Sequence, residues 1–236
     1  MAKHKKKVAI FDVDGTIFRS SLLIEFVETL IQEGIFKAGT EKIYDKYYRN
    51  WLDRKDSYEK YINKVVEAFD KNLKGVKYDD FVKIAREVAN FHKDRVYRYT
   101  RNLVDELKKK NYFLLAISNS PKIILDEFCK KLGFDKVYGR IYEIDKKEKF
   151  TGKTLYTDVI SDKAKILQRA IAKENLIIRG SIGVGDTESD VAFLNMVDRP
   201  ICFNPNKKLW DFARKSGWEI VVERKDVIYN FGTAKH

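Results

Sequence analysis

Residues 7–16 read KVAIFDVDGT, an apolar run that ends in two aspartates separated by one residue. The length and composition of Lys7 to Val13 predict a strand that is buried on both faces. The segment Asp14 to Thr16 ends the run, since its glycine lets the chain turn sharply. Charge at the carboxyl edge of a sheet is costly unless a metal ion or hydrogen bonds compensate it. The pair Asp12 and Asp14 therefore indicates a functional site rather than packing.

Two kinds of pattern follow this strand. Up to about residue 100, apolar residues recur at three- and four-residue spacing, which predicts a block of four or five helices. Beyond it, short apolar runs alternate with helical patterns, as in parallel sheets that are covered on both faces. We therefore expect a doubly wound, parallel-sheet (Rossmann-like) α/β core formed by 1–17 and 101–236, with a helical cap domain inserted at 18–100.

Five strands and five helices are predicted after the helical block. Proline suits the first turn of a helix, so Pro121 is expected to open one of them. Serine is favoured at helix N-termini, so Ser161 is expected to cap another. The strands are predicted at 112–117, 137–144, 181–184, 200–203 and 219–222, and the helices at 99–110, 121–132, 161–175, 187–195 and 206–216.

Three further polar groups lie beside these elements. The serines and asparagine of 118–120 precede a predicted helix, whose N-terminus suits an anion. Lys163 is early in a helix, from which a lysine can hold a phosphate and its attacking carboxylate together. GDTESD at 185–190 supplies Asp186 and Asp190, oxygen ligands of the kind Mg²⁺ prefers. Singly, these groups read as an N-cap, a solvated lysine and a helix cap. Ligands bind at the carboxyl ends of strands in open α/β sheets, so together they predict one site.

The composition narrows the class of protein. Of 236 residues, 44% are hydrophobic and 35% charged, with a formal charge of +12 that is dispersed along the chain. Dispersed charge is typical of a solvated surface, so no specific nucleic-acid partner is expected. No apolar run approaches the ~20 residues of a membrane helix. Cys129 and Cys202 have no ligand-spaced neighbours and are expected to be reduced core thiols. We expect a cytoplasmic protein without a membrane partner.

The four motifs occur in one order: DVDGT at 12–16, SNS at 118–120, Lys163, and GDTESD at 185–190. In this order the chain resembles the haloacid-dehalogenase-like hydrolase superfamily, and within it the phosphoserine-phosphatase-like subgroup (subfamily IB). The resemblance covers the sheet domain throughout, whereas the helical insertion is similar only in position and length. It implies a Mg²⁺-dependent phosphomonoester phosphatase that acts on a small soluble substrate through an aspartyl-phosphate intermediate.

The resemblance also implies a role for each motif residue. Asp12 would attack phosphorus and ligate Mg²⁺. Asp14 would protonate the leaving alcohol and then activate water, while its backbone carbonyl ligates the metal, and Asp186 would be the third protein ligand. Phosphate would be bound by Ser118, the N–H of Asn119 and Lys163, with Lys165 as the alternative lysine. The outer shell of the metal would include Ser189 and Asp190.

The chain departs from the subgroup at the substrate. Ser21 stands where phosphoserine phosphatases carry a glutamate that binds the substrate's amine, which argues against phosphoserine. Asn119 stands where glycine or alanine is commoner and would crowd the phosphate pocket. An aromatic and basic cluster in the cap could read the leaving group, although aromatic stripes at helical spacing usually serve packing. Its members are Tyr44, Tyr47, Tyr48, Arg49, Trp51 and Arg54.

Other functions stay open on the sequence alone. A phosphotransferase would use the same residues, with another hydroxyl in place of water. A basic protein that binds nucleic acid or a partner on a non-catalytic core is disfavoured by the intact Asp12, Asp14, Lys163 and Asp186. A dehalogenase is disfavoured too, because it attacks carbon without Mg²⁺ and would leave the other carboxylates superfluous.

Overall fold

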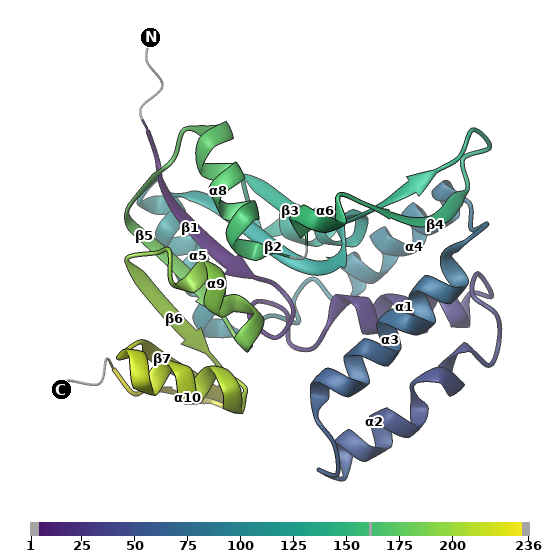
Figure 1. Ribbon diagram of the computed structural model, residues 1–236, viewed down its shortest axis with the longest axis horizontal. Coiled ribbons are helices and arrows are strands. Elements are labelled where there is room, and N and C mark those ends of the chain that lie inside the picture. Colours follow the sequence, from purple (N-terminus) through teal and green to yellow (C-terminus); the bar gives the residue numbers. More distant parts are fainter. Residues whose placement is uncertain (1–4, 161, 233–236) are drawn as a thin grey trace.

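The protein is described by a computed structural model that covers residues 5–160 and 162–232. Within these residues, eight strands form one sheet. Figure 1 shows the chain coloured by sequence, with the sheet on one side and the block of early helices on the other. The strands are β1 Lys7–Asp12, β2 Phe113–Pro121, β3 Lys136–Ile144, β4 Phe150–Leu155, β5 Ile177–Gly185, β6 Arg199–Phe203, β7 Glu219–Arg224 and β8 Val227–Asn230.

The strand order is β4-β3-β2-β1-β5-β6-β7-β8. The six inner strands pair in parallel, and the two edge strands, β4 and β8, pair antiparallel to their neighbours. β1 therefore lies at the centre of the sheet, between β2 and β5. From β1 the chain adds β2 and β3 toward one edge and then β5, β6 and β7 toward the other. Open α/β sheets bind ligands where the strand order reverses in this way.

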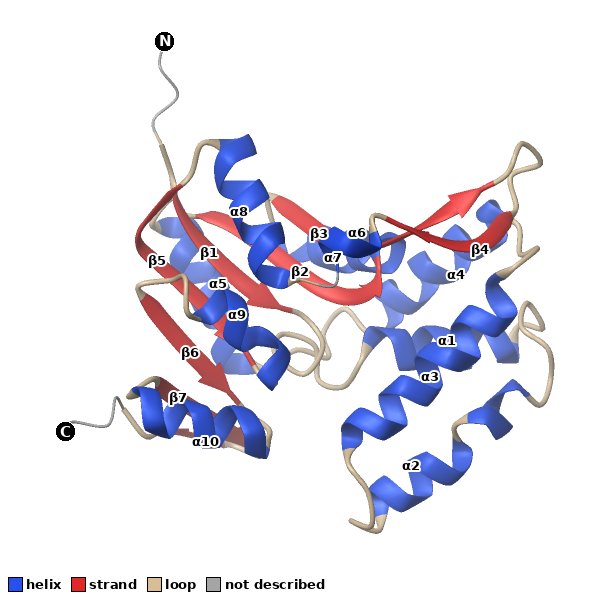
Figure 2. Ribbon diagram, in the orientation of Figure 1, coloured by secondary structure: helices blue, strands red, loops and turns tan. Residues whose placement is uncertain are grey.

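The helices fall into two groups, one on the sheet and one beside it (Figure 2). Those after the helical block cover the two faces of the sheet, and those of the block form the cap. The cap contains α1 Leu22–Gln32, a 3₁₀ turn Thr40–Ile43, α2 Asp45–Leu52, α3 Tyr58–Leu73 and α4 Tyr78–Phe91. The sheet carries α5 Arg98–Lys109, α6 Lys122–Leu132, α7 Thr157–Ile160, α8 Lys163–Glu174, a 3₁₀ turn Glu188–Asp190, α9 Val191–Leu194 and α10 Lys207–Ser216.

Both faces of the sheet are buried. Along β1, Ala9 and Phe11 pack with α5 and α6, whereas Val8 and Ile10 pack with α8, α9 and α10. All four side chains are fully buried, and each large one stabilises the fold by roughly 1.5–3 kcal/mol. This arrangement confirms the predicted doubly wound α/β core with an inserted helical cap.

The cap has an aromatic interior that it shares with the edge of the sheet. Phe26 of α1 meets Phe81 of α4 with ring centroids 4.6 Å apart, and Phe150 of β4 lies 4.7 Å from the same ring. Backbone bonds join the two parts as well, since Gly75 donates to the carbonyl of Phe150 at 2.8 Å. The β3–β4 hairpin is therefore packed into the cap, although it belongs to the sheet.

Three details differ from the sequence prediction. α6 begins at Lys122, because Pro121 has the non-helical angles φ −56° and ψ 131° and still pairs with Arg140 in the sheet. The segment 118–120 thus ends a strand instead of opening a helix. α8 is capped by Asp162, whose carboxylate accepts from two backbone N–H groups, while the expected cap Ser161 lies outside the described residues. Strands β4 and β8 were not predicted.

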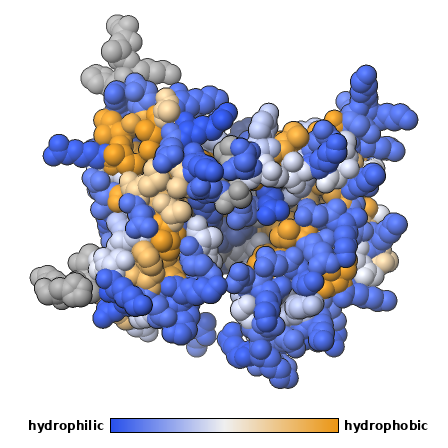
Figure 3. All heavy atoms as spheres, in the orientation of Figure 1, coloured by the Kyte–Doolittle hydropathy of each residue, from blue (hydrophilic) through white to orange (hydrophobic). Residues whose placement is uncertain are grey.

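Charged and polar side chains cover most of the face in Figure 3, with a hollow between the sheet domain and the cap. None of the helices in 5–160 and 162–232 is long and apolar enough to cross a membrane.

Candidate active site

The candidate site is centred on one buried lysine between two buried aspartates. Lys163, the first residue of α8, donates to Oδ1 of Asp12 at 2.6 Å and to Oδ1 of Asp190 at 2.5 Å. Their exposed fractions are 6% for Lys163, 5% for Asp12 and 0% for Asp190. Charges at this depth need partners of opposite sign, and each side chain here supplies one. Three segments far apart in sequence therefore meet at the carboxyl end of β1.

Asp186 completes a group of three carboxylates. Oxygens of Asp12, Asp186 and Asp190 all lie within 4.8 Å of one another. Asp190 uses its second oxygen to accept from the backbone N–H groups of Asp186 and Thr187, at 3.0 and 3.1 Å. Among the hydrogen bonds of the described residues, none involves the carboxylate of Asp186. Asp12 and Asp186 thus retain oxygens for a ligand, while Asp190 holds the lysine and the loop.

The electrostatics of this group favour a cation. Burial raises the pKa of Asp186 well above its usual range, and the neighbouring Asp12 and Asp190 raise it further. Burial also raises the pKa of Asp12, against the lowering effect of Lys163. The two aspartates raise the pKa of Lys163 despite its burial, so it remains an ammonium. A bound divalent cation would supply the positive charge that these carboxylates lack.

Asp14 faces a different set of partners. Its Oδ1 accepts from the N–H of Leu22 at 2.6 Å, and its Oδ2 accepts from the hydroxyls of Ser118 and Ser120 at 2.5 and 2.8 Å. Its carboxylate does not belong to the group of three, which leaves its backbone carbonyl as the atom implied for a metal. The roles of Ser120 and Leu22 were missed, although Ser120 lies inside the SNS motif.

Two glycines permit these close approaches. A Cβ on Gly15, which has φ +79°, would lie 2.1 Å from Oδ2 of Asp186. A Cβ on Gly185 would lie 2.5 Å from the Cβ of Asp190. No side chain fits at either position without moving a carboxylate, so the two aspartate motifs require glycine where they face each other.

Other predicted residues lie at the margin of the site. Asn119 and Ser189 are exposed, and the hydroxyl of Ser189 lies 2.8 Å from that of Thr187. The side chain of Lys165 is 62% exposed, with its ammonium 3.9 Å from Asp162. Lys163, and not Lys165, is therefore the lysine that reaches Asp12.

The cap brings Tyr58 toward the site. Tyr58 is 36% exposed and lies near Ser21; partial burial, followed by the charges of Asp14 and then Asp186, raises its pKa. The predicted aromatic and basic cluster is divided: Trp51 packs on Tyr58 with ring centroids 5.3 Å apart, whereas Tyr44 is buried and Arg49 is paired with Asp45 on the surface of α2. Nothing in the sequence distinguishes Tyr58 from the other tyrosines of the cap, because its place depends on how the cap lies on the core.

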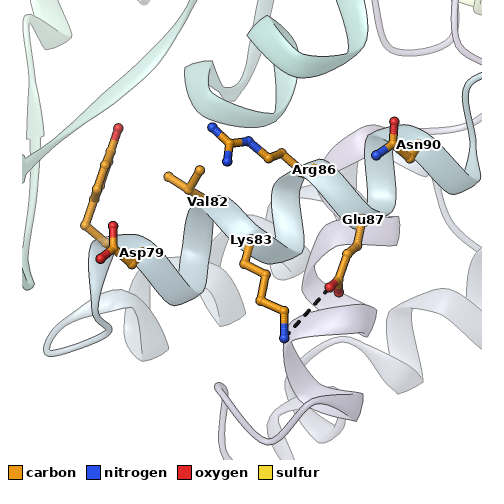
Figure 4. Close-up of a pocket in the computed structure, with 7 residues that line it drawn as sticks. Asp79, Val82, Lys83, Arg86, Glu87 and Asn90 are labelled. Carbon is orange, nitrogen blue, oxygen red and sulfur yellow. Dashed lines mark ion pairs between the residues drawn. The ribbon is translucent and has the colours of Figure 1, made fainter.

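A surface groove of about 530 Å³ lies on α4 (Figure 4). Lys83 and Glu87 form an ion pair along one side of α4, with their charged atoms 3.9 Å apart. None of the four site aspartates lines it, so it is separate from the site described above. It is lined by Tyr78, Asp79, Val82, Lys83, Arg86, Glu87 and Asn90.

The sequence matches the family of haloacid dehalogenase-like hydrolases over residues 9–195. The histidinol-phosphatase of Neisseria meningitidis is 23% identical over 233 residues, which cover 92% of this chain and 98% of that protein. The phosphoserine phosphatase of Methanocaldococcus jannaschii is 23% identical over 227 residues, which cover 95% of this chain and 96% of that protein.

Solved structures confirm the fold. A protein of unknown function from Bordetella pertussis has a TM-score of 0.70 at 16% identity, covering 92% of this chain and 98% of that one. A phospho-aspartyl intermediate analogue of phosphoserine phosphatase has a TM-score of 0.62 at 22% identity, covering 94% and 95% of the two chains. As the sequence predicted, the chain belongs to the family of haloacid dehalogenase-like hydrolases.

Proposed function

We propose that this protein is a Mg²⁺-dependent phosphatase that hydrolyses small phosphomonoesters through a phosphoryl group on Asp12. The observation that carries the proposal is the buried contact of Lys163 with Asp12 and Asp190, with Asp186 within 4.8 Å of both aspartates. Phosphoryl transfer relies on positioning and on neutralising charge, and this cluster offers both a nucleophile and an ammonium. Relatives that are named phosphatases over nearly their whole length support it.

The donor set fits Mg²⁺, a hard cation that takes oxygen ligands. The free oxygens of Asp12 and Asp186 and the backbone carbonyl of Asp14 would hold it, with Asp190 fixing the loop behind them. Bound there, the ion neutralises charge on the phosphate oxygens. Its presence would also relieve the repulsion among the three carboxylates, since burial raises the pKa of Asp12 and that of Asp186.

In the first step, a carboxylate oxygen of Asp12 forms a bond to phosphorus and the bond from phosphorus to the alcohol breaks. Asp14, held by Ser118 and Ser120, gives its proton to the departing alcohol. In the second step, water attacks phosphorus while Asp14 takes its proton. The bond from phosphorus to Asp12 then breaks, and inorganic phosphate leaves. Lys163 lowers the pKa of Asp12 against the effect of burial and balances negative charge on the phosphoryl group.

The leaving group is a small alcohol other than serine. Ser21 is 3% exposed and lies near Tyr58 and Asp14, so the side chains that we propose to lie beside the leaving group are neutral hydroxyls. A buried ammonium needs a partner of opposite charge, which neither hydroxyl supplies.

The test is a screen of small phosphomonoesters with and without Mg²⁺, in which released phosphate is measured. Turnover of at least one substrate that depends on Mg²⁺ is expected. Turnover that is undiminished in excess chelator would contradict the metal site. Transfer of phosphate to an added alcohol without release to water would instead identify a phosphotransferase.

A further inference from the structure

The first turn of α3 carries two side chains that reach the core. Glu59 lies with its Oε2 3.2 Å from the ammonium of Lys208, which belongs to the first turn of α10. The same ammonium donates to Oε1 of Glu188 at 2.6 Å. Lys208 therefore bridges a carboxylate of the cap and a carboxylate of the loop between β5 and α9.

That loop is the one that carries Asp186. Glu188 follows Asp186 by two residues, and the N–H of Asn206 donates to the backbone carbonyl of Asp186 at 2.8 Å. Asn206 is also the N-cap of α10, and its side-chain amide donates to Glu188. The first turn of α10 is thus anchored on the loop of the proposed metal ligand, and Lys208 extends from it to the cap.

The neighbour of Glu59 reaches the opposite side of the site. The side chain of Tyr58 lies near Ser21, the N-cap of α1. The next residue, Leu22, donates its N–H to Asp14 at 2.6 Å. One helical turn of the cap is therefore linked to the two loops of the site indirectly, through Lys208 to Glu188 and through the start of α1 to Asp14.

We propose that Lys208 is a positioning residue of the phosphatase reaction: its bridge from Glu188 to Glu59 holds the first turn of α3 over the substrate, with Tyr58 against Ser21. The proposal rests on the proposed function. Lys208 acts on the substrate only through Glu59 and its neighbour Tyr58.

The exposure of the bridge decides which property it controls. The side chains of Lys208 and Glu59 are 64% and 60% exposed, and that of Glu188 is 33% exposed. Ion pairs at such exposure contribute little to the stability of a fold and are weakened by salt. The bridge can therefore break and reform as substrate enters. Removing it is expected to change KM rather than the melting temperature.

The test compares Lys208→Gln with Lys207→Gln. Lys207 is the adjacent residue of the same helix and pairs with Asp211 of that helix at 2.9 Å, so its variant removes the same charge without touching the cap. With the best small phosphomonoester at low salt, Lys208→Gln is expected to raise KM by roughly two- to fivefold at nearly constant kcat, the effect of one exposed pair. Lys207→Gln is expected to leave both unchanged.

Three further measurements separate positioning from a general effect of charge. Lys208→Arg should restore KM. Adding Glu59→Gln to Lys208→Gln should raise KM no further. Backbone hydrogen exchange of residues 57–62 should be faster in Lys208→Gln than in the wild type and unchanged in Lys207→Gln, which reports on the cap without any turnover.

Equal KM values for the two lysine variants would overturn the proposal, and so would faster exchange without a change in KM. A wild-type protein that hydrolyses none of the phosphomonoesters would overturn the proposed function itself. In that case the exchange measurement would still show whether Lys208 holds the cap.

Discussion

The ammonium of Lys163 lies 2.6 Å from Oδ1 of Asp12, inside the protein and at the end of the central strand. The two residues are 151 positions apart in the sequence. The helix α8 leads into β5, which is parallel to β1, so α8 begins at the edge of the sheet where β1 ends. This contact lowers the pKa of the proposed nucleophile against the opposing effect of its burial. Most of the proposed chemistry depends on it.

Replacing Lys163 by methionine is expected to abolish most of the turnover and to destabilise the metal-free protein. The variant leaves the carboxylates of Asp12 and Asp190 buried without their cation. Breaking a buried pair costs about 3–5 kcal/mol, and losing one electrostatic contact to the reacting group costs ~10²–10³ in kcat. Urea unfolding and phosphate release measure the two effects. Lys165→Met is the control, and a loss of activity in that variant alone would show that the other lysine serves the site.

The effect of Mg²⁺ on stability is expected to grow with pH. Burial raises the pKa of Asp12 from 3.8 to about 8, with Lys163 opposing the rise. The folded protein therefore holds a proton that the unfolded chain loses, so this group's stabilising contribution is lost as pH rises from about 4 to 8. Mg²⁺ replaces that proton, and at a hundred times its Kd it adds ~2.7 kcal/mol.

Melting temperatures at pH 5.5 and pH 8, with and without Mg²⁺, measure this effect. The metal-free protein should melt lower at pH 8, and the rise on adding Mg²⁺ should be larger there. Asp186→Asn is the control and should remove most of that rise. A rise that is equal at the two pH values would contradict the coupling between the metal and the carboxylates.

The sequence predicted the elements that follow from periodicity and from motif order. Local patterns, together with the rule that parallel strands end at one edge, were enough to predict the buried central strand, the helical insertion and a site formed by the four polar motifs. The antiparallel edge strands were missed, because β4 contains glycine and lysine in place of the apolar residues of a buried strand. Its pairing depends on the cap, into which Phe150 packs.

The contacts of the cap could not be predicted in the same way. Glu59 and Lys208 are 149 residues apart, and no periodicity links them. Tyr58 is one of several tyrosines in the cap, and only the position of α3 over the core selects it. The partners of Asp14 could be predicted only in part. Ser118 and Ser120 lie in a motif that the sequence analysis singled out, but the sequence does not show that the strand turns both hydroxyls to Asp14.

Phosphoserine is not expected to be a preferred substrate. Ser21 and Tyr58 offer hydroxyls at the leaving-group side of the site, and a buried ammonium requires a negative partner. The sharpest comparison is between phosphoserine and its analogue without the amino group, 3-phosphooxypropanoate. The analogue should have an equal or higher kcat/KM. A clear preference for phosphoserine would show that its amine is bound elsewhere in the cap.

Asp12→Asn and Asp14→Asn are expected to fail at different steps. An amide is a far poorer nucleophile than a carboxylate, so Asp12→Asn should form no covalent intermediate and should release no phosphate. Asp14 handles protons, and an aryl phosphate needs little help from an acid because its alcohol leaves readily. With such a substrate, Asp14→Asn should still form the intermediate but should lack the base that activates water.

The two variants can be told apart by intact-mass spectrometry after mixing with an aryl phosphate and Mg²⁺. Asp14→Asn should gain the mass of one phosphoryl group, located on Asp12 by peptide analysis, and Asp12→Asn should gain none. Both should unfold cooperatively, which shows that the loss is chemical. Phosphate found on a serine or a histidine in either variant would refute Asp12 as the nucleophile. The buried contact between Lys163 and Asp12 would then have a structural role instead of a catalytic one.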